Sequence, residues 1–149
     1  MQDVVLTIQG RQLYDDQEPE VIELVTEGTM EKLEDGWLIT YEESALTGLE
    51  GVQTSFLLQP GKVTLTRTGR LQSQMVFQIG VLHESLYRME FGAMLIGVCA
   101  VDMDYQLTDE GGTVALAYRI EIEHGAAGIV EYDLEVKRKG PERDTLSEM

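Results

Sequence analysis

The sequence predicts an all-β protein, most simply a closed antiparallel meander β-barrel of about eight to ten strands. Apolar and polar residues alternate along most of the chain with the period of two that is typical of half-buried strands. Turn residues such as Asp35-Gly36 and Pro60-Gly61 separate the alternating runs, and helical periodicity is almost absent. A flat sheet of so many strands would leave two adhesive edges, so a closed barrel is favoured and a sandwich is the alternative.

The expected strands follow one another with short connections, which imply hairpins between consecutive strands. Two long runs, 95–105 and 114–122, suit the tilted wall of a barrel. In the first of them Leu95, Cys99 and Val101 are assigned the same face as Met103, which makes Cys99 a buried structural thiol. The expected strands lie at 4–8, 22–26, 37–41, 54–58, 63–67, 75–79, 87–91, 95–105, 114–122 and 130–136.

The length of 149 residues fits one domain with one core. We assign residues 1–139 to a single barrel domain. Residues 140–149 are expected to form a disordered tail, because they are charged and begin with Gly140-Pro141. With one cysteine, no visible secretory signal and no apolar run of membrane-spanning length, the expected location is the cytoplasm.

The charge distribution argues against two classes of partner. The net charge is −16, and only residues 51–100, with 2 acidic and 4 basic residues, lack a negative excess. Nucleic-acid binding depends on basic residues that neutralise phosphates, and anionic membranes attract basic segments. We therefore expect neither nucleic acid nor membrane as a partner.

No metal, cofactor or catalytic motif is recognisable. His83 and His124 have no other ligand at the spacing of a metal site, and no nucleophile elbow or phosphate loop is present. An acid–base pair of Tyr41 with Glu42 or Glu43 would be the enzymatic alternative, but nothing in the spacing requires it. A protein that is not an enzyme is the favoured interpretation.

Arg67 is the strongest candidate for a binding residue. It follows Val63 and Leu65 with period two and should point where they point. Inside a barrel it would need a carboxylate or a bound anion, since arginine cannot lose its charge. Glu43 and, at the rim, Glu42 are the candidate carboxylates. The alternative is a rim arginine beside Gly69 that is half in water.

Tyrosines form a second set of candidates. Five of them occupy apolar-face positions, where a ring can pack and a hydroxyl can meet a polar ligand. They either fill the lumen or line a ligand cavity, and the sequence leaves both possibilities open. The set is Tyr41, Tyr87, Tyr105, Tyr118 and Tyr132, and the proposed ligand-binding residues are Arg67, Glu43, Tyr41, Thr54, Tyr87 and Tyr118.

The run Tyr-Glu-Glu-Ser-Ala-Leu-Thr-Gly-Leu-Glu-Gly at residues 41–51 is a specific sequence feature. Together with several other segments, it resembles the YwiB-like family of small bacterial proteins. The resemblance implies a calycin-like, or lipocalin-like, β-barrel in the bacterial cytosol and carries no established activity. Further matching segments lie at Thr54, 63–67, Gly69, 75–77, Tyr87, 91–92 and 112–118.

The favoured function is therefore the binding of a small amphipathic or anionic molecule in or at the mouth of the barrel. The alternative is a protein-interaction module that uses the acidic loop 42–51 to hold a basic partner. A homodimer formed through strand edges is also possible.

Overall fold

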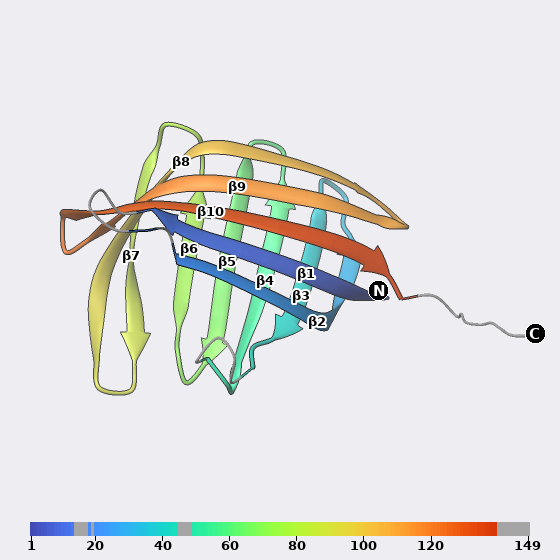
Figure 1. Ribbon diagram of the computed structural model, residues 1–149, viewed down its shortest axis with the longest axis horizontal. Coiled ribbons are helices and arrows are strands. Elements are labelled where there is room, and N and C mark those ends of the chain that lie inside the picture. The colour runs from blue at the N-terminus through green and yellow to red at the C-terminus, as the bar shows by residue number, and fades with distance from the viewer. Residues whose placement is uncertain (14–17, 19, 45–48, 140–149) are drawn as a thin grey trace, which may run out of the picture.

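The computed structural model describes residues 1–13, 18, 20–44 and 49–139, which form one antiparallel sheet of ten strands (Figure 1). The predicted all-β class is confirmed. The expected tail at 140–149 and residues 45–48 of the acidic loop lie outside the described residues. The strands are β1 (Gln2–Leu13), β2 (Glu20–Lys32), β3 (Trp37–Glu42), β4 (Val52–Gln59), β5 (Lys62–Gly69), β6 (Ser73–Phe77), β7 (Leu82–Met89), β8 (Gly92–Thr108), β9 (Gly111–Ile122) and β10 (Gly125–Arg138).

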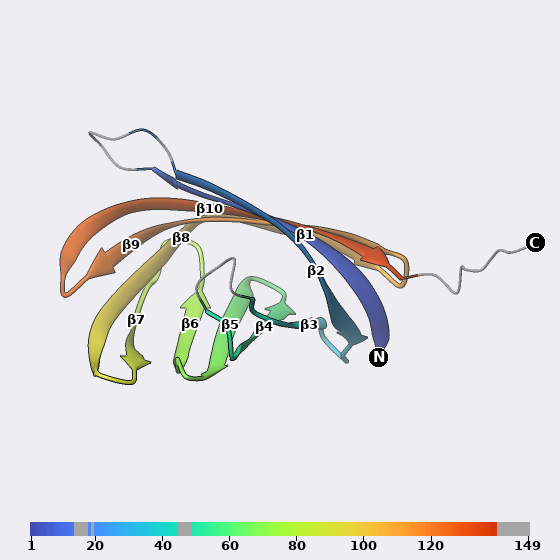
Figure 2. The same cartoon turned by 60° about the horizontal axis from the view of Figure 1, so that its bottom comes forward.

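The sheet is a meander that rolls into a nearly closed barrel. Its strand order is β6-β5-β4-β3-β2-β1-β10-β9-β8-β7, so β1 joins the two ends of the chain by pairing with both β2 and β10. Figure 2 shows the long strands curving over β3 to β6. The barrel, not the alternative sandwich, is the architecture.

Among the described residues, a few isolated bridges close the seam between the β6 side and strands β7 and β8. Gln72 and Arg88 exchange backbone hydrogen bonds of 2.9 and 2.8 Å, and the Gly80 amide donates to the Ala100 carbonyl at 3.0 Å. Two expected strands end early at this seam. β6 stops at Phe77, so that Ile79 is exposed, and β7 stops at Met89, so that Phe91 lies in an exposed turn.

No helix in the described part of the chain is long and apolar enough to cross a membrane.

A β-bulge in β8 changes which residues of this strand face the lumen. Ala100 pairs with Tyr118 and Asp102 pairs with Ala117, so Val101 is an extra residue without a partner on β9. Even-numbered residues face inward before the bulge and odd-numbered residues face inward after it. The prediction that Leu95, Cys99, Val101 and Met103 share a buried face is therefore wrong. Cys99 is half-buried on the outer side.

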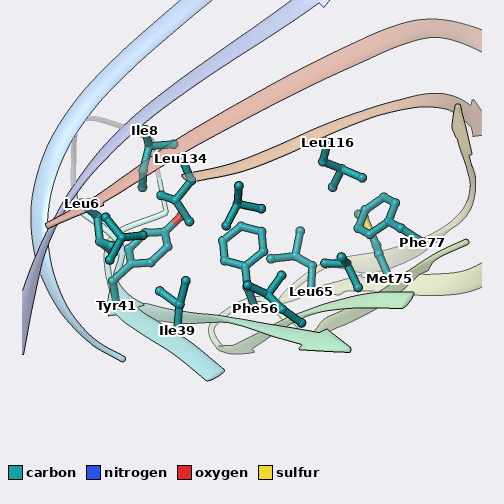
Figure 3. Close-up of a cluster of buried hydrophobic side chains, with 14 of the residues drawn as sticks. Leu6, Ile8, Ile39, Tyr41, Phe56, Leu65, Met75, Phe77, Leu116 and Leu134 are labelled. Carbon is teal, nitrogen blue, oxygen red and sulfur yellow. The ribbon is translucent and has the colours of Figure 1, made fainter. Parts of the chain in front are cut away.

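The apolar core lies between the two walls of the barrel. Two inward rows cross the wall formed by β3, β4, β5 and β6, and each row consists of residues paired at the same register. These side chains face the opposite wall of the barrel, as Figure 3 shows for Phe77 and Leu116. Burying such side chains supplies most of the driving force for folding. The rows are Trp37, Leu58, Val63 and Phe77, and Ile39, Phe56, Leu65 and Met75.

Candidate ligand-binding site

A row of polar side chains lies directly beside the apolar rows. Tyr41, Thr54, Arg67 and Ser73 are paired in register across β3, β4, β5 and β6, and all four point into the lumen. Successive side chains of a strand point to opposite faces of the sheet. Thr54 and Arg67, two positions from Phe56 and Leu65, therefore face inward like them. We call these four residues the polar row. Its members are largely buried, with only 15% of the Arg67 side chain exposed.

Glu43 extends this site beyond the end of β3. Its backbone amide donates to the Val52 carbonyl at 2.8 Å, so the residue keeps its place in the ladder and its side chain points inward like that of Tyr41. The Thr54 hydroxyl donates to Oε2 of Glu43 at 2.5 Å. The same oxygen lies 4.0 Å from Nε of Arg67. Glu42 is exposed and accepts a bond from Gln53 instead, so Glu43 is the interior carboxylate of the pair.

Arg67 is an interior residue, and the alternative of a half-solvated rim arginine is wrong. Its Nε is fully buried and has no hydrogen-bond acceptor among the described residues. The ion pair with Glu43 is long and is not a hydrogen bond. Buried polar groups without a partner are rare, and each calls for a specific explanation. The described residues therefore leave the guanidinium incompletely satisfied at Nε.

Tyr41 and Tyr132 meet across the lumen. Their hydroxyl oxygens lie 3.1 Å apart, although the residues are 91 positions apart in the chain. Burial raises the pKa of Tyr41, and the neighbouring Tyr132 raises it further. Burial also raises the pKa of Tyr132 and that of Tyr118, the latter to about 12 even though Arg67 opposes the shift. All three phenols therefore stay neutral at physiological pH and can donate hydrogen bonds.

The polar row borders a cavity of about 390 Å³. This volume lies within the range of small-molecule sites, which are mostly apolar with a few polar groups. The cavity extends to the end of the barrel where β1 ends and β2 begins, and Ile22 there is 54% exposed. The lining consists of Ile8, Gly10, Arg11, Gln12, Glu20, Ile22, Leu24, Tyr41, Glu43, Leu49, Arg67, Met75, Tyr87, Met94, Ile96, Tyr118, Ile120, Ile122, Val130 and Tyr132.

The structure brings together five of the six residues that were proposed from the sequence. Arg67, Glu43, Tyr41, Tyr87 and Tyr118 line the cavity. Thr54 does not line the cavity, because it is fully buried. Its hydroxyl donates a hydrogen bond to the Glu43 carboxylate.

Tyr132 is a further site residue. The sequence predicts it as a member of the tyrosine set but not as a ligand-binding residue. Its parity put it on an inward face, but its pairing with Tyr41 joins distant strands and leaves no local signal. Tyr105, the remaining member of the set, packs against the core outside the cavity lining.

The site offers hydrogen-bond donors and apolar surface more than metal ligands. Among residues 1–13, 18, 20–44 and 49–139, no group of three or more His, Cys, Asp or Glu side chains is arranged to hold a metal ion. The lining contains one interior cation, Arg67, together with four tyrosines and many aliphatic side chains. Such a site is suited to an amphipathic molecule with an acceptor-rich head.

Comparisons with known proteins identify the fold and the family. The crystal structure of the ywiB protein from Bacillus subtilis superimposes with a TM-score of 0.83 at 22% sequence identity, and the match covers 93% of each chain. This similarity supports the barrel fold. No curated protein matches the sequence significantly. The model of a domain of unknown function, DUF1934, matches residues 6–139. The chain therefore belongs to the DUF1934 family.

Proposed function

We propose that this protein is a binding barrel that holds a small amphipathic anion in its lumen and does no chemistry on it. The observation that carries the proposal is the position of the Arg67 guanidinium in the cavity wall. Its buried Nε donates a hydrogen bond to no described residue. A buried guanidinium remains charged, so it is stable only with an anion or acceptors nearby. An anion bound against the part of Arg67 that borders the cavity would add to the charge balance that Glu43 provides from 4.0 Å.

The rest of the cavity supports an apolar body on this ligand. Aliphatic side chains from β1, β2, β8, β9 and β10 form a large part of the lining, among them Leu24, Ile96 and Ile120. Removing apolar ligand surface from water at about 25 cal/mol per Å² favours binding to such a wall. The ligand would thus combine a negative head with an apolar body.

The chemistry of the site supports binding over catalysis. A general base near neutral pH needs a pKa close to that pH. Burial moves the pKa values of Tyr41, Tyr118 and Tyr132 upward, away from that range. We propose the cytoplasm as the setting of this binding, since a chain with one cysteine needs no oxidising compartment.

The test uses 1-anilinonaphthalene-8-sulfonate, an aromatic anion whose fluorescence rises in apolar surroundings. The wild-type protein should bind it in a saturable way, and Arg67→Met should weaken binding about tenfold or more, the value of a charge-assisted hydrogen bond. Arg119→Met removes the same charge from the exposed outer face of β9 and should leave the affinity unchanged. Equal affinity in the wild type and in a folded Arg67→Met variant would contradict the proposal.

A further inference from the structure

We infer that the ligand is a monocarboxylate of modest size, bound with its carboxylate inward against Arg67; this inference rests on the proposed function. The modest size follows from the cavity volume of about 390 Å³, which lies at the lower end of the range for small-molecule sites. The charge, the head group and the orientation follow from the residues around Arg67.

The charges at the inner end of the cavity favour a head with a single negative charge. Arg67 is the cation there, and the Glu43 carboxylate lies beside it with only 2% of its side chain exposed. A dianionic phosphate would place two negative charges next to Glu43 and oppose them with one guanidinium. Like charges repel strongly where water is scarce, so a monoanion fits better than a dianion.

The donors around Arg67 match a carboxylate. A guanidinium presents its N–H groups as a planar fork that binds the two oxygens of a carboxylate. Tyr41 and Tyr132 share one hydrogen bond between two hydroxyls, which leaves one hydroxyl hydrogen of the pair to donate. Burial raises the pKa of both phenols, so that this hydrogen is retained. A carboxylate has enough lone pairs for both kinds of donor.

The arrangement of the lining fixes the orientation. Arg67 and Tyr41 belong to the polar row, which adjoins the filled core. Ile22 and Ile122 lie near the open end and are 54% and 39% exposed. The carboxylate would therefore lie deep in the lumen, and the apolar chain would run outward along aliphatic side chains to the mouth.

The experiment compares probes of one size by isothermal titration calorimetry: decanoate, 1-decanol and octyl phosphate. Decanoate should bind about tenfold or more tightly than decanol, as expected for a charge-assisted hydrogen bond. It should also bind more tightly than octyl phosphate. Arg67→Met should remove the preference over decanol, and Arg119→Met should keep it. In NMR spectra, the terminal methyl group of decanoate should show contacts to Ile22 and Ile122 and none to the Tyr41 ring.

The outcomes separate the two proposals. If octyl phosphate binds as tightly as decanoate, or if the terminal methyl group contacts Tyr41, the monocarboxylate inference is wrong while anion binding stands. If decanol equals decanoate in the wild-type protein, the head-group assignment at Arg67 fails. If neither these probes nor anilinonaphthalene sulfonate binds, the proposed function fails as well.

Discussion

Thr54 and Glu43 are joined by a hydrogen bond of 2.5 Å in which the threonine hydroxyl donates to the carboxylate deep in the barrel wall. Thr54 has no exposed surface, and Glu43 is 7% exposed. The bond fixes the carboxylate beside Arg67. Thr54 therefore acts on the site through Glu43 and has no surface with which to touch a ligand.

Replacing Thr54 by valine should destabilise the protein. Valine has nearly the same shape but leaves the buried Glu43 carboxylate without this donor, which costs about 1.5–3 kcal/mol for a bond to a charged group. Thr54→Ser keeps the hydroxyl and should cost less, and urea unfolding measures both. Equal stability of the two variants would show that the bond contributes little.

Arg67 and Glu43 should depend on each other energetically. Arg67→Met leaves Glu43 without its cation, and we expect a loss of about 2–3 kcal/mol, below the about 3–5 kcal/mol for breaking a fully buried pair. The double variant Arg67→Met/Glu43→Gln removes both charges and should be more stable than Arg67→Met alone. A double-mutant cycle from urea unfolding measures the coupling, and additive effects would refute it.

The buried phenol of Tyr118 should make stability fall in alkali. Its pKa in the folded protein is about 12, above the usual value of 10. Above pH 10 the unfolded chain releases this proton first, so this contribution to stability is complete below pH 10 and is lost between pH 10 and 12, by up to about 3 kcal/mol. Tyr118→Phe cannot ionise and should show a shallower decline in urea unfolding from pH 9 to 11.5. Identical pH profiles would contradict the raised pKa of Tyr118.

Gly69, at the end of β5, should tolerate no side chain. Its φ is +121°, and a Cβ atom there would overlap the carbonyl oxygen of Gly51. Gly69→Ala should cost more than about 1–3 kcal/mol, because steric overlap adds to the backbone strain. Gly61 is the control, since its φ is +72° and a Cβ would meet nothing within 4 Å. Thermal unfolding should show the smaller loss for Gly61→Ala.

Deleting Val101 should be tolerated better than deleting a neighbour. Val101 is the extra residue of the bulge, so its removal restores simple alternation and keeps Met103 and Tyr105 inward. Deleting Asp104 would turn Tyr105 and Leu107 outward and break the core. Circular dichroism melting of the two deletion variants compares them. A less stable Val101 deletion would show that the bulge itself is required.

The sequence was informative wherever period two and a turn fixed the register. Asp35-Gly36 and Pro60-Gly61 lie in the turns of short hairpins. The inward direction of Tyr41 and Arg67 follows from the apolar residues two positions before them in the same strands. The partnership of Arg67 with Glu43 was also among the candidates. These predictions needed only local chemistry and the need of a buried charge for a partner.

Other features depended on contacts between distant strands. The bulge at Val101 adds one residue, and no turn residue in the sequence marks it. Simple alternation of inward and outward side chains along the whole strand therefore predicts the wrong face for Cys99. The contact of Tyr41 with Tyr132 and the size of the cavity depend on how the barrel closes. Side-chain parity indicates which way a residue points but not how much room it finds there.

The position of the polar row has a consequence for how this barrel can evolve. Phe56 and Leu58 belong to the buried core and do not line the cavity, whereas Ile22 and Ile122 line it near the open end and are 54% and 39% exposed. Substitutions at the open end can therefore change ligand length or shape at little cost to stability. Under the proposed function, we expect family members that keep the polar row to differ in the ligand that they bind while they share the same fold.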